Sequence, residues 1–411
     1  MITLGVFDPD VQDRALDEYV QYTQKLTGVQ DWGNKRQLRG DKEGEWVNFQ
    51  KAEAGDMKVK EVQQFLKDAG FFSGKIDGIC GYRTTSAIRL FQEYVRTVEG
   101  DASIGFPDGK LGPTSLNHVK RWKAANKKAD WANFSSAKPS PEYMKWMNLL
   151  GKVKQKYSAT PNKMLQLVNQ FSQPSDTIKP AGWDFNPSKI HLVGVRRNEA
   201  KLAVSAGQRK FDDGFALLIN GLVFKFYGST DPGETKNPSG APFLVQGQHL
   251  YRFGWHKLSD QNRVYHALKP LTTGVLVVRS KDMALTEADL GGGLERNNSI
   301  NIHWGGEGIS TIGAWSEGCQ VFVGKGYINH NGKVIECSKY GAPNYSTLGT
   351  VVNGVYQTKG AYTVLGDLVA ALSGANPDDN VVRYTLLYEQ DLALSPDTGI
   401  VKDLEILRQF E

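Results

Sequence analysis

Cysteine is scarce in this sequence, with three residues, Cys80, Cys319 and Cys337, in a chain of 411. The three stand far apart and form no C-x-x-C pair, so their spacing indicates neither a disulfide framework nor a zinc ribbon. An odd number leaves at least one thiol outside any intramolecular disulfide. The role of each cysteine must therefore be judged from its neighbours in the sequence.

Long apolar runs are also missing. None approaches the roughly 18 residues that cross a bilayer. The opening MITLGVFDPDVQDRALDEYV has acidic residues where a secretory signal has a basic start and an apolar run of about 7 to 15 residues. We therefore expect no membrane insertion, and a chain made in the cytoplasm without a signal peptide. If the protein acts outside the cell, it must then be released or delivered without a signal peptide.

Neither sign of charge dominates, because 49 Lys and Arg against 44 Asp and Glu give a net charge of +5. So small an excess does not indicate nucleic acid as a partner, and we expect none, although it suits an anionic polymer such as a cell wall. Apolar residues at 40% and charged residues at 23% are typical of a globular protein. The length predicts two or three domains.

The composition and the spacing of apolar residues change three times along the chain. Residues 1–55 are polar and are predicted to form an N-terminal helical arm, residues 56–122 show three apolar helix faces, and residues 123–182 are predicted to form a helical linker. Residues 183–411 consist of short β-type runs between Gly and Asp turns, with a helix expected at TVLGDLVAALSG and packed against them. The expected fold class is therefore multidomain α+β: a three-helix bundle, a linker and a mainly-β domain.

One turn pattern, D-G-x-x-G-x-x-[ST], occurs twice, and each copy leads into an apolar helix face. Glycine provides the turn with its unusual backbone angles and the hydroxyl caps the helix, so helix capping by itself explains the spacing. The two copies, 31 residues apart, are Asp77, Gly78, Gly81 and Thr84, then Asp108, Gly109, Gly112 and Ser115.

With their flanking helices, these turns resemble the peptidoglycan-binding domain, a small three-helix bundle, over residues 56–122. The elements VxxVQxxL, GxIDGxxG, AIRxFQ and DGxxGPxS occur in that order, and the connection EYVRTVEGDASIGFP is longer than the family's usual one. The resemblance implies peptidoglycan as a partner. It also places Cys80 where the family has a bulky apolar residue, so we interpret Cys80 as a core residue.

The stretch AWSEGCQVF contains the cysteine of greatest chemical interest. A predicted strand carries His303 near its end, a glycine-rich loop follows, and Cys319 opens the next strand 16 residues later. An imidazole beside a thiol favours the thiolate, which is the attacking species. Gly318 lacks a Cβ, so the turn can expose its own N–H and that of Cys319 toward a developing oxyanion. Ser316 is expected to orient the loop or to donate to a substrate.

Other interpretations of these residues stay open. A cysteine beside glycine is often a small buried residue, a disulfide between Cys319 and Cys337 is conceivable, and His303 and His330 with these two cysteines could ligate a metal. The spacings match no common zinc pattern, and a disulfide is disfavoured in a chain made in the cytoplasm. We therefore expect no metal and no other cofactor.

The same segment resembles the active-site signature of the L,D-transpeptidase family, in which a strand His is followed 14 to 18 residues later by S-x-G-C. The resemblance spans roughly residues 213–323 and includes an upstream hairpin leading to a T-P-x-G turn. Glu317 stands where the family usually has a second His. The matching residues are His303, Ser316, Gly318 and Cys319, with Thr230, Pro232 and Gly233 upstream.

The resemblance implies that Cys319 attacks a carbonyl of a wall stem peptide while His303 takes its proton. The resulting thioester passes to an amine, which makes a cross-link, or to water, which makes the protein a peptidase. Glu317 is the position where that choice is expected. Trp304 and Trp315 are predicted either to wall the cleft or to pack, and a histidine in the stretch GQHLYRFGWHKLSDQ, His256, is predicted to contact substrate.

The wall-binding resemblance and the Cys/His pair indicate the same polymer, so the sequence predicts a peptidoglycan-active cysteine enzyme. Without a signal peptide, we expect a bacteriophage endolysin released through a holin, a virion-associated lysin or an effector delivered by an injection apparatus, and hydrolysis as the reaction. Two alternatives stay open. One is a true transpeptidase that cross-links or edits stem peptides, and the other is a non-catalytic wall-binding component of a virion or injection apparatus.

Overall fold

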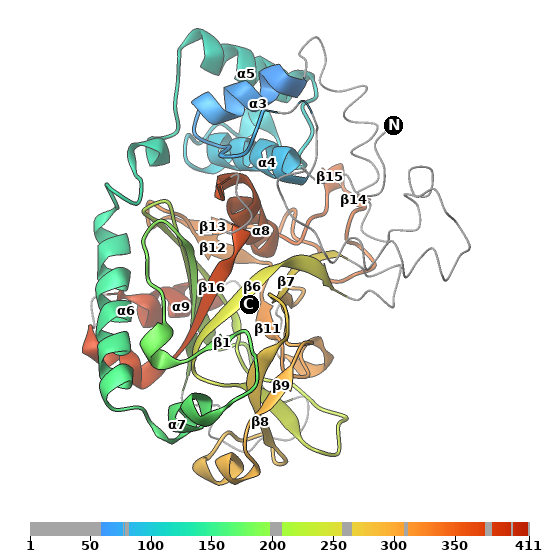
Figure 1. Ribbon diagram of the computed structural model, residues 1–411. Helices are drawn as coiled ribbons and strands as arrows, with labels where there is room; N and C mark the ends of the chain where they lie inside the picture. The colour runs from blue at the N-terminus through green and yellow to red at the C-terminus, as the bar shows by residue number, and fades with distance from the viewer. Residues whose placement is uncertain are drawn as a thin grey trace, which may run out of the picture. The chain divides into compact units, whose positions relative to one another are not determined.

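The computed structural model describes residues 59–76, 78, 82–197, 208–256, 265–307, 311–374, 380–395 and 398–409 (Figure 1). The predicted arm at 1–55 and Cys80 lie outside these residues. The chain divides into two compact units. Of the described residues, those within 59–133, 253–267 and 344–380 form the helical unit, and those within 134–252, 268–343 and 381–409 form the sheet unit. The boundaries at 55, 122 and 182 that we infer from sequence stay predictions.

The helical unit contains the three helices that the sequence predicts: α3 (Val59–Asp68), α4 (Tyr82–Thr97) and α5 (Pro113–Ala124). Gly70 follows α3 with φ of +91°, a left-handed conformation that suits glycine after a helix. The core of the bundle is aromatic. The ring of Phe71 makes edge contacts with Phe91, Tyr94 and Trp131 at centroid distances of 5.5, 5.4 and 5.2 Å.

Segments distant in sequence complete the helical unit. They form the hairpin of β14 (Val351–Val352) and β15 (Val355–Tyr356), followed by α8 (Ala361–Leu372) (Figure 1). The helix predicted at TVLGDLVAALSG is therefore present, but it belongs to the helical unit and packs along α4, whereas the sequence predicts packing on the β domain. The reason is two arginines of α4. Arg89 forms an ion pair with Asp367, and Arg83 donates to the carbonyl of Ala370.

The sheet unit is built on one large sheet, which confirms a mainly-β region. Its strand order is β11-β10-β7-β6-β16-β2-β3-β4-β12-β13, and β11 also pairs with β4, so the sheet closes on itself. The strands are β2 (Ile190–Arg196), β3 (Asp213–Ile219), β4 (Leu222–Ser229), β6 (Gly247–His256), β7 (Tyr265–Pro270), β10 (Ile302–Trp304), β11 (Gln320–Phe322), β12 (Gly326–Ile328), β13 (Val334–Glu336) and β16 (Val382–Tyr388).

Smaller elements surround this sheet. Strand β1 (Thr177–Ile178) pairs with β6, and β5 (Ala241–Leu244), β8 (Val275–Ser280) and β9 (Glu295–Asn297) form a separate three-stranded sheet. The helices are α6 (Pro141–Ala159), α7 (Lys163–Gln170) and α9 (Ile400–Arg408).

Helix α6 lies in the segment that we predict as a linker and is part of the hydrophobic core. Ser140 caps its N-terminus by accepting a hydrogen bond from the N–H of Tyr143, and Pro141 occupies the first turn, where no N–H is needed. Trp146, Leu150 and Val153 are fully buried in one cluster with residues of β2, β3 and β5. In the part of the chain that the structure describes, no helix combines the length and apolar character needed to span a membrane.

Candidate active site

The pairing of β10 with β11 brings together the two chain segments that carry the predicted nucleophile and base. They pair in parallel, with His303 opposite Val321, and the N–H of Gln320 donates to the carbonyl of Asn301 at 2.9 Å. Parallel strands need a connection of roughly a dozen residues or more, which the spacing between His303 and Cys319 allows. Cys319 directly precedes β11, two residues before Val321, the strand partner of His303.

The thiol of Cys319 is half-buried and lies against the chain that enters β10. Its Sγ is 3.3 Å from the carbonyl oxygen of Ser299 and 3.3 Å from the amide nitrogen of Asn301. The buried hydroxyl of Tyr251 donates to the next carbonyl, that of Ile300, at 3.0 Å. Burial raises the pKa of Tyr251 well above its usual value, and the neighbouring Tyr384 and Cys319 raise it further. Tyr251 therefore stays protonated and holds this segment in place.

The ring of His303 is buried and has a defined orientation. Its Nδ1 lies 2.8 Å from the carbonyl oxygen of Trp304. Because a carbonyl can only accept, Nδ1 carries the proton of the neutral ring, and Nε2 is its basic nitrogen. The backbone thus fixes the tautomer that a general base requires.

Ser316 closes the turn that carries Cys319. Its hydroxyl donates to the carbonyl of Cys319 at 2.8 Å and accepts the N–H of Gly318 at 3.1 Å. The N–H of Gly318 is thus engaged inside the turn, contrary to the prediction that it faces an oxyanion. We predict two roles for Ser316, and these contacts fit the first, which is to orient the loop.

Gly318 occupies a position that only glycine suits. Its φ is +136°, and a Cβ there would lie 2.6 Å from Cγ of Pro242 and 2.7 Å from the carbonyl oxygen of Pro242. The close approach of this backbone to Pro242 explains the glycine before Cys319 without reference to an oxyanion.

The upstream turn that we match to T-P-x-G lies directly against the cysteine turn. The N–H of Gly233 donates to the carbonyl of Ser316 at 2.8 Å. A Cβ on Gly233 would lie 2.4 Å from the carbonyl oxygen of Gly313, so this approach also depends on glycine. The sequence motif therefore has a structural role, because it supports the backbone of Ser316.

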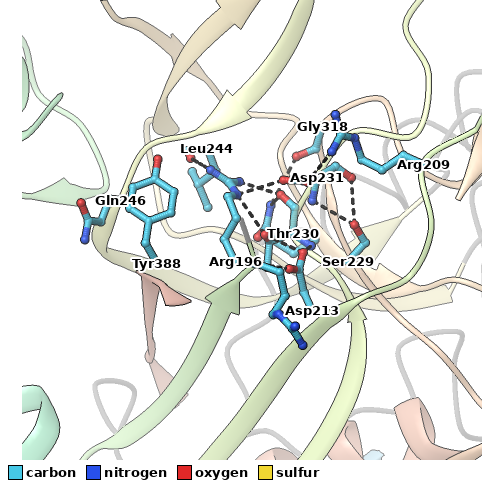
Figure 2. Close-up of polar contacts among 12 residues, drawn as sticks. Arg196, Arg209, Asp213, Ser229, Thr230, Asp231, Leu244, Gln246, Gly318 and Tyr388 are labelled. Carbon is cyan, nitrogen blue, oxygen red and sulfur yellow. Dashed lines mark hydrogen bonds and ion pairs between the residues drawn. The ribbon is translucent and has the colours of Figure 1, made fainter. Parts of the chain in front are cut away.

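A buried charged cluster lies behind these two turns (Figure 2). Arg196 is fully buried, and its Nη2 donates to the carbonyl of Thr230 at 2.7 Å while its Nε pairs with Asp231 at 3.0 Å. Arg209 pairs with the other oxygen of Asp231 at 3.1 Å. Asp213 accepts the N–H of Thr230 at 2.6 Å and its hydroxyl at 2.9 Å. Burial raises the pKa of Asp213 to about 7, with the charge of Asp231 adding to the rise.

Gln320 connects this charged cluster to the cysteine turn. Its Nε2 donates to the carbonyl of Thr230 at 3.2 Å and to that of Gly318 at 3.4 Å, and its Oε1 accepts the hydroxyl of Tyr384 at 2.8 Å. Our reading of the sequence misses Arg196, Arg209, Asp213 and Asp231. Charges at the ends of otherwise apolar strand runs, as in KIHLVGVRR and FDDGFALLI, are the signal that could have found Arg196 and Asp213, because buried charges need partners.

The predicted substrate contacts have different positions. Trp304 is fully buried and packs edge-on against Trp315 at 5.4 Å, and strand alternation directs it to the face opposite His303. These positions fit the packing interpretation of Trp304. Glu317 is exposed at the tip of the turn. His256, the last residue of β6, belongs with residues 253–256 of that strand to the helical unit, and its buried ring packs edge-on against Tyr265 at 5.4 Å.

The described residues bear on the two alternative chemistries for the cysteines. No disulfide joins Cys319 to Cys337, and the buried Sγ of Cys337 lies 3.1 Å from the hydroxyl of Tyr340. Nor do three His, Cys, Asp or Glu side chains gather anywhere in the described ranges as a metal site would require.

Comparison with known proteins gives one finding. The family model described as "Putative peptidoglycan binding domain" matches residues 56–97, which span α3, α4 and the turn between them. No curated protein and no solved structure matches the chain significantly. The chain therefore carries a peptidoglycan-binding domain at residues 56–97, which associates it with peptidoglycan and with action at the cell wall.

Proposed function

We propose that the protein is a peptidoglycan-active cysteine enzyme in which Cys319 is the nucleophile and His303 its general base. The observation that carries the proposal is the parallel register of β10 and β11, which sets His303 opposite Val321, two residues after Cys319. The hydrogen bond from Nδ1 of His303 to a carbonyl leaves Nε2 as the basic nitrogen. The peptidoglycan-binding domain in the same chain supplies the substrate class.

The reaction begins with attack of the Cys319 sulfur on the carbonyl carbon of a stem-peptide amide. As the C–S bond forms, Nε2 of His303 takes the thiol proton. His303 then gives this proton to the leaving amine as the C–N bond breaks, and a thioester remains. Water next attacks the thioester carbon, and His303 takes a proton from the water. As the C–S bond breaks, His303 gives this proton to the leaving sulfur and so restores the thiol, and the released carboxylic acid loses its proton to solvent.

Ser316, Gly318 and Gln320 are positioning residues in this proposal. Ser316 and Gln320 hold the backbone on either side of the thiol, and Gly318 permits the close approach to Pro242. Holding a reacting atom in one geometry removes part of the entropic barrier to reaction. The expected setting, a phage lysin or an injected effector, belongs to this proposal and favours hydrolysis.

One observation favours transfer to an amine as a second candidate reaction. Glu317, two residues before the nucleophile, is exposed. A carboxylate at this position attracts a cationic amine acceptor, which would make the protein an L,D-transpeptidase-like enzyme that cross-links or edits stem peptides.

The test is to incubate purified sacculi with the wild type and with Cys319→Ala and to identify the products by mass spectrometry. New free peptide ends formed only by the wild type support hydrolysis, and new peptide dimers support transfer. Cys337→Ala is the matched control, since it also removes a cysteine and is expected to keep activity. Identical products from wild type and Cys319→Ala would contradict the proposal, and sacculus binding without any product would favour a non-catalytic wall-binding component.

A further inference from the structure

The helical unit contains a cavity of about 70 Å³ that our account of the Cys319 site does not use. One wall is α4, inside the matched peptidoglycan-binding domain, which contributes Tyr82 and Arg89. The other walls come from outside the match: His266, and the segment from Leu348 to Gly366 that includes Tyr356 and Lys359. The cavity therefore exists only where three distant parts of the chain meet.

Side-chain contacts of Arg89 and Arg83 hold α4 against α8, and both helices contribute walls of this cavity. Arg89 makes a two-pronged ion pair with Asp367, with Nε to Oδ2 at 2.8 Å and Nη2 to Oδ1 at 2.6 Å. Arg83 is fully buried and donates to the carbonyl of Ala370 in α8 at 2.7 Å and to that of Ser373, the residue after α8. Such a planar guanidinium fixes two helices in one geometry.

The lining of the cavity is aromatic and carries two cations. Of the described residues that form it, Arg89 and Lys359 are cationic and none is acidic, and the charge of Arg89 is paired with Asp367. Tyr82 stacks on His266 at 4.3 Å with the rings 10° from parallel. Tyr356, the last residue of the β14–β15 hairpin, is also part of the lining, and the Nζ of Lys110 is 5.9 Å from its ring centre. A lysine among aromatic side chains in a small cavity can attract an anionic group on an organic ligand.

The hairpin beside the cavity exposes apolar side chains. Val351 and Val352 in β14 are 66% and 40% exposed, and with Met144 they are the large hydrophobic side chains that the described surface exposes. Asn353 and Gly354, with φ of 50° and 78°, form the tight turn that projects them. An apolar edge next to a cationic cavity suits a peptide that carries a carboxylate.

We propose that this cavity is a second peptidoglycan-binding site, which takes a carboxylate of the stem peptide and is formed jointly by α4 and residues 348–366. Peptidoglycan is the occupant because α4 belongs to the matched domain, and the stem peptide is the part of peptidoglycan that carries carboxylates. A cavity of about 70 Å³ has room for one carboxylate and not for a whole sugar. This site does not depend on the role of Cys319.

The first experiment measures binding of the full-length chain to purified sacculi. The background is Cys319→Ala, so that any cleavage does not consume the substrate. Lys359→Glu is expected to weaken binding about tenfold or more, since a hydrogen bond to a charged group contributes about 1.5 to 3 kcal/mol. Lys359→Gln, which only neutralises the charge, should weaken it less. The control is Lys402→Glu, which makes the same change on an exposed lysine of the sheet unit and should leave binding unchanged.

The second experiment titrates the protein with a synthetic stem pentapeptide and with the same peptide amidated at its carboxylates. The proposal predicts that the acid binds, that the amide binds at least about tenfold more weakly, and that Lys359→Glu removes this preference. Thermal unfolding checks that the variants fold. Equal binding of acid and amide, or sacculus binding by Lys359→Glu equal to that of Lys402→Glu, would overturn the proposal.

Discussion

The hydroxyl of Ser316 donates to the carbonyl of Cys319 at 2.8 Å and accepts the N–H of Gly318 at 3.1 Å, so one buried side chain closes the turn beneath the thiol. Removal of this hydroxyl leaves a buried carbonyl and a buried N–H without their partner. The backbone of Cys319 should then lose its fixed geometry while the thiol itself stays intact.

Ser316→Ala is therefore expected to lower kcat/KM on sacculi about tenfold or more, since two hydrogen bonds worth about 1 kcal/mol each are lost. The control is Ser299→Ala, which removes an exposed hydroxyl but keeps the backbone carbonyl that faces Sγ. Wild-type kinetics of Ser316→Ala would show that the turn does not need its hydroxyl.

Gly318→Ala tests the close approach to Pro242. The added Cβ would lie 2.6 Å from Cγ of Pro242 on a backbone with φ of +136°, and strain and overpacking should together lower the free energy of unfolding by about 2 kcal/mol or more. The control, Gly332→Ala, has φ of +71° and nothing within 4 Å of the new Cβ. It should cost only about 1 kcal/mol. Urea denaturation measures both, and equal costs would contradict the packing argument.

Asp213 should make stability depend on pH. Its pKa is raised from 3.8 to about 7 in the folded protein, so between these values the folded state holds a proton that the unfolded state has released. Stability therefore falls as pH rises from about 4 to about 7 and then levels off. Asp213→Asn removes this contribution, so urea unfolding between pH 5 and 8 should show a shallower decline than in the wild type.

The control for Asp213 is Asp282, whose hydrogen bonds with Ser280 and Ala284 lower its pKa. A carboxyl with a lowered pKa is ionised in both states above its unfolded value, so Asp282→Asn should change stability by a constant amount from pH 5 to 8. Parallel pH profiles for the wild type and Asp213→Asn would contradict the raised pKa.

The ion pair of Arg89 and Asp367 should hold the helical unit together. Its side chains are 11% and 3% exposed, and removal of one partner from a buried pair costs about 3 to 5 kcal/mol because a charge is left alone. Arg89→Met should approach this cost, and the double variant with Asp367→Asn should recover part of it. By contrast, Lys163→Met breaks an ion pair with Glu287 that is exposed on both sides and should cost less than about 1 kcal/mol. Additive effects of the two changes would contradict a coupled pair.

The comparison of sequence with structure shows which features local patterns can predict. Helices α3, α4 and α5 follow from apolar periodicity and turn glycines within each segment, and the pairing of β10 with β11 follows from a short connection. The contact between Arg89 and Asp367 joins residues 278 positions apart, and no local pattern indicates it. α8 is therefore visible as a helix in the sequence, but its packing partner is not.

The same limit applies to the candidate site. Cys319, His303, Ser316 and Gly318 are visible because they share one loop and its flanking strands. The support from Thr230 and Gln320 depends on the pairing of β11 with β4, which closes the sheet. The N–H of Gly318 looks available in the sequence, and only the position of the Ser316 hydroxyl shows that it is engaged.

The central claim, that Cys319 forms a covalent acyl-enzyme, is tested most directly by mass spectrometry of peptides from the acid-quenched protein. The full-length protein is mixed with soluble muropeptides, quenched in acid within the first turnovers and digested for peptide mapping. The account predicts a thioester adduct on the peptide that contains Cys319 and no adduct in Cys319→Ala. Cleavage of muropeptides by Cys319→Ala at the wild-type rate, with no adduct on Cys319 in the wild type, would contradict it.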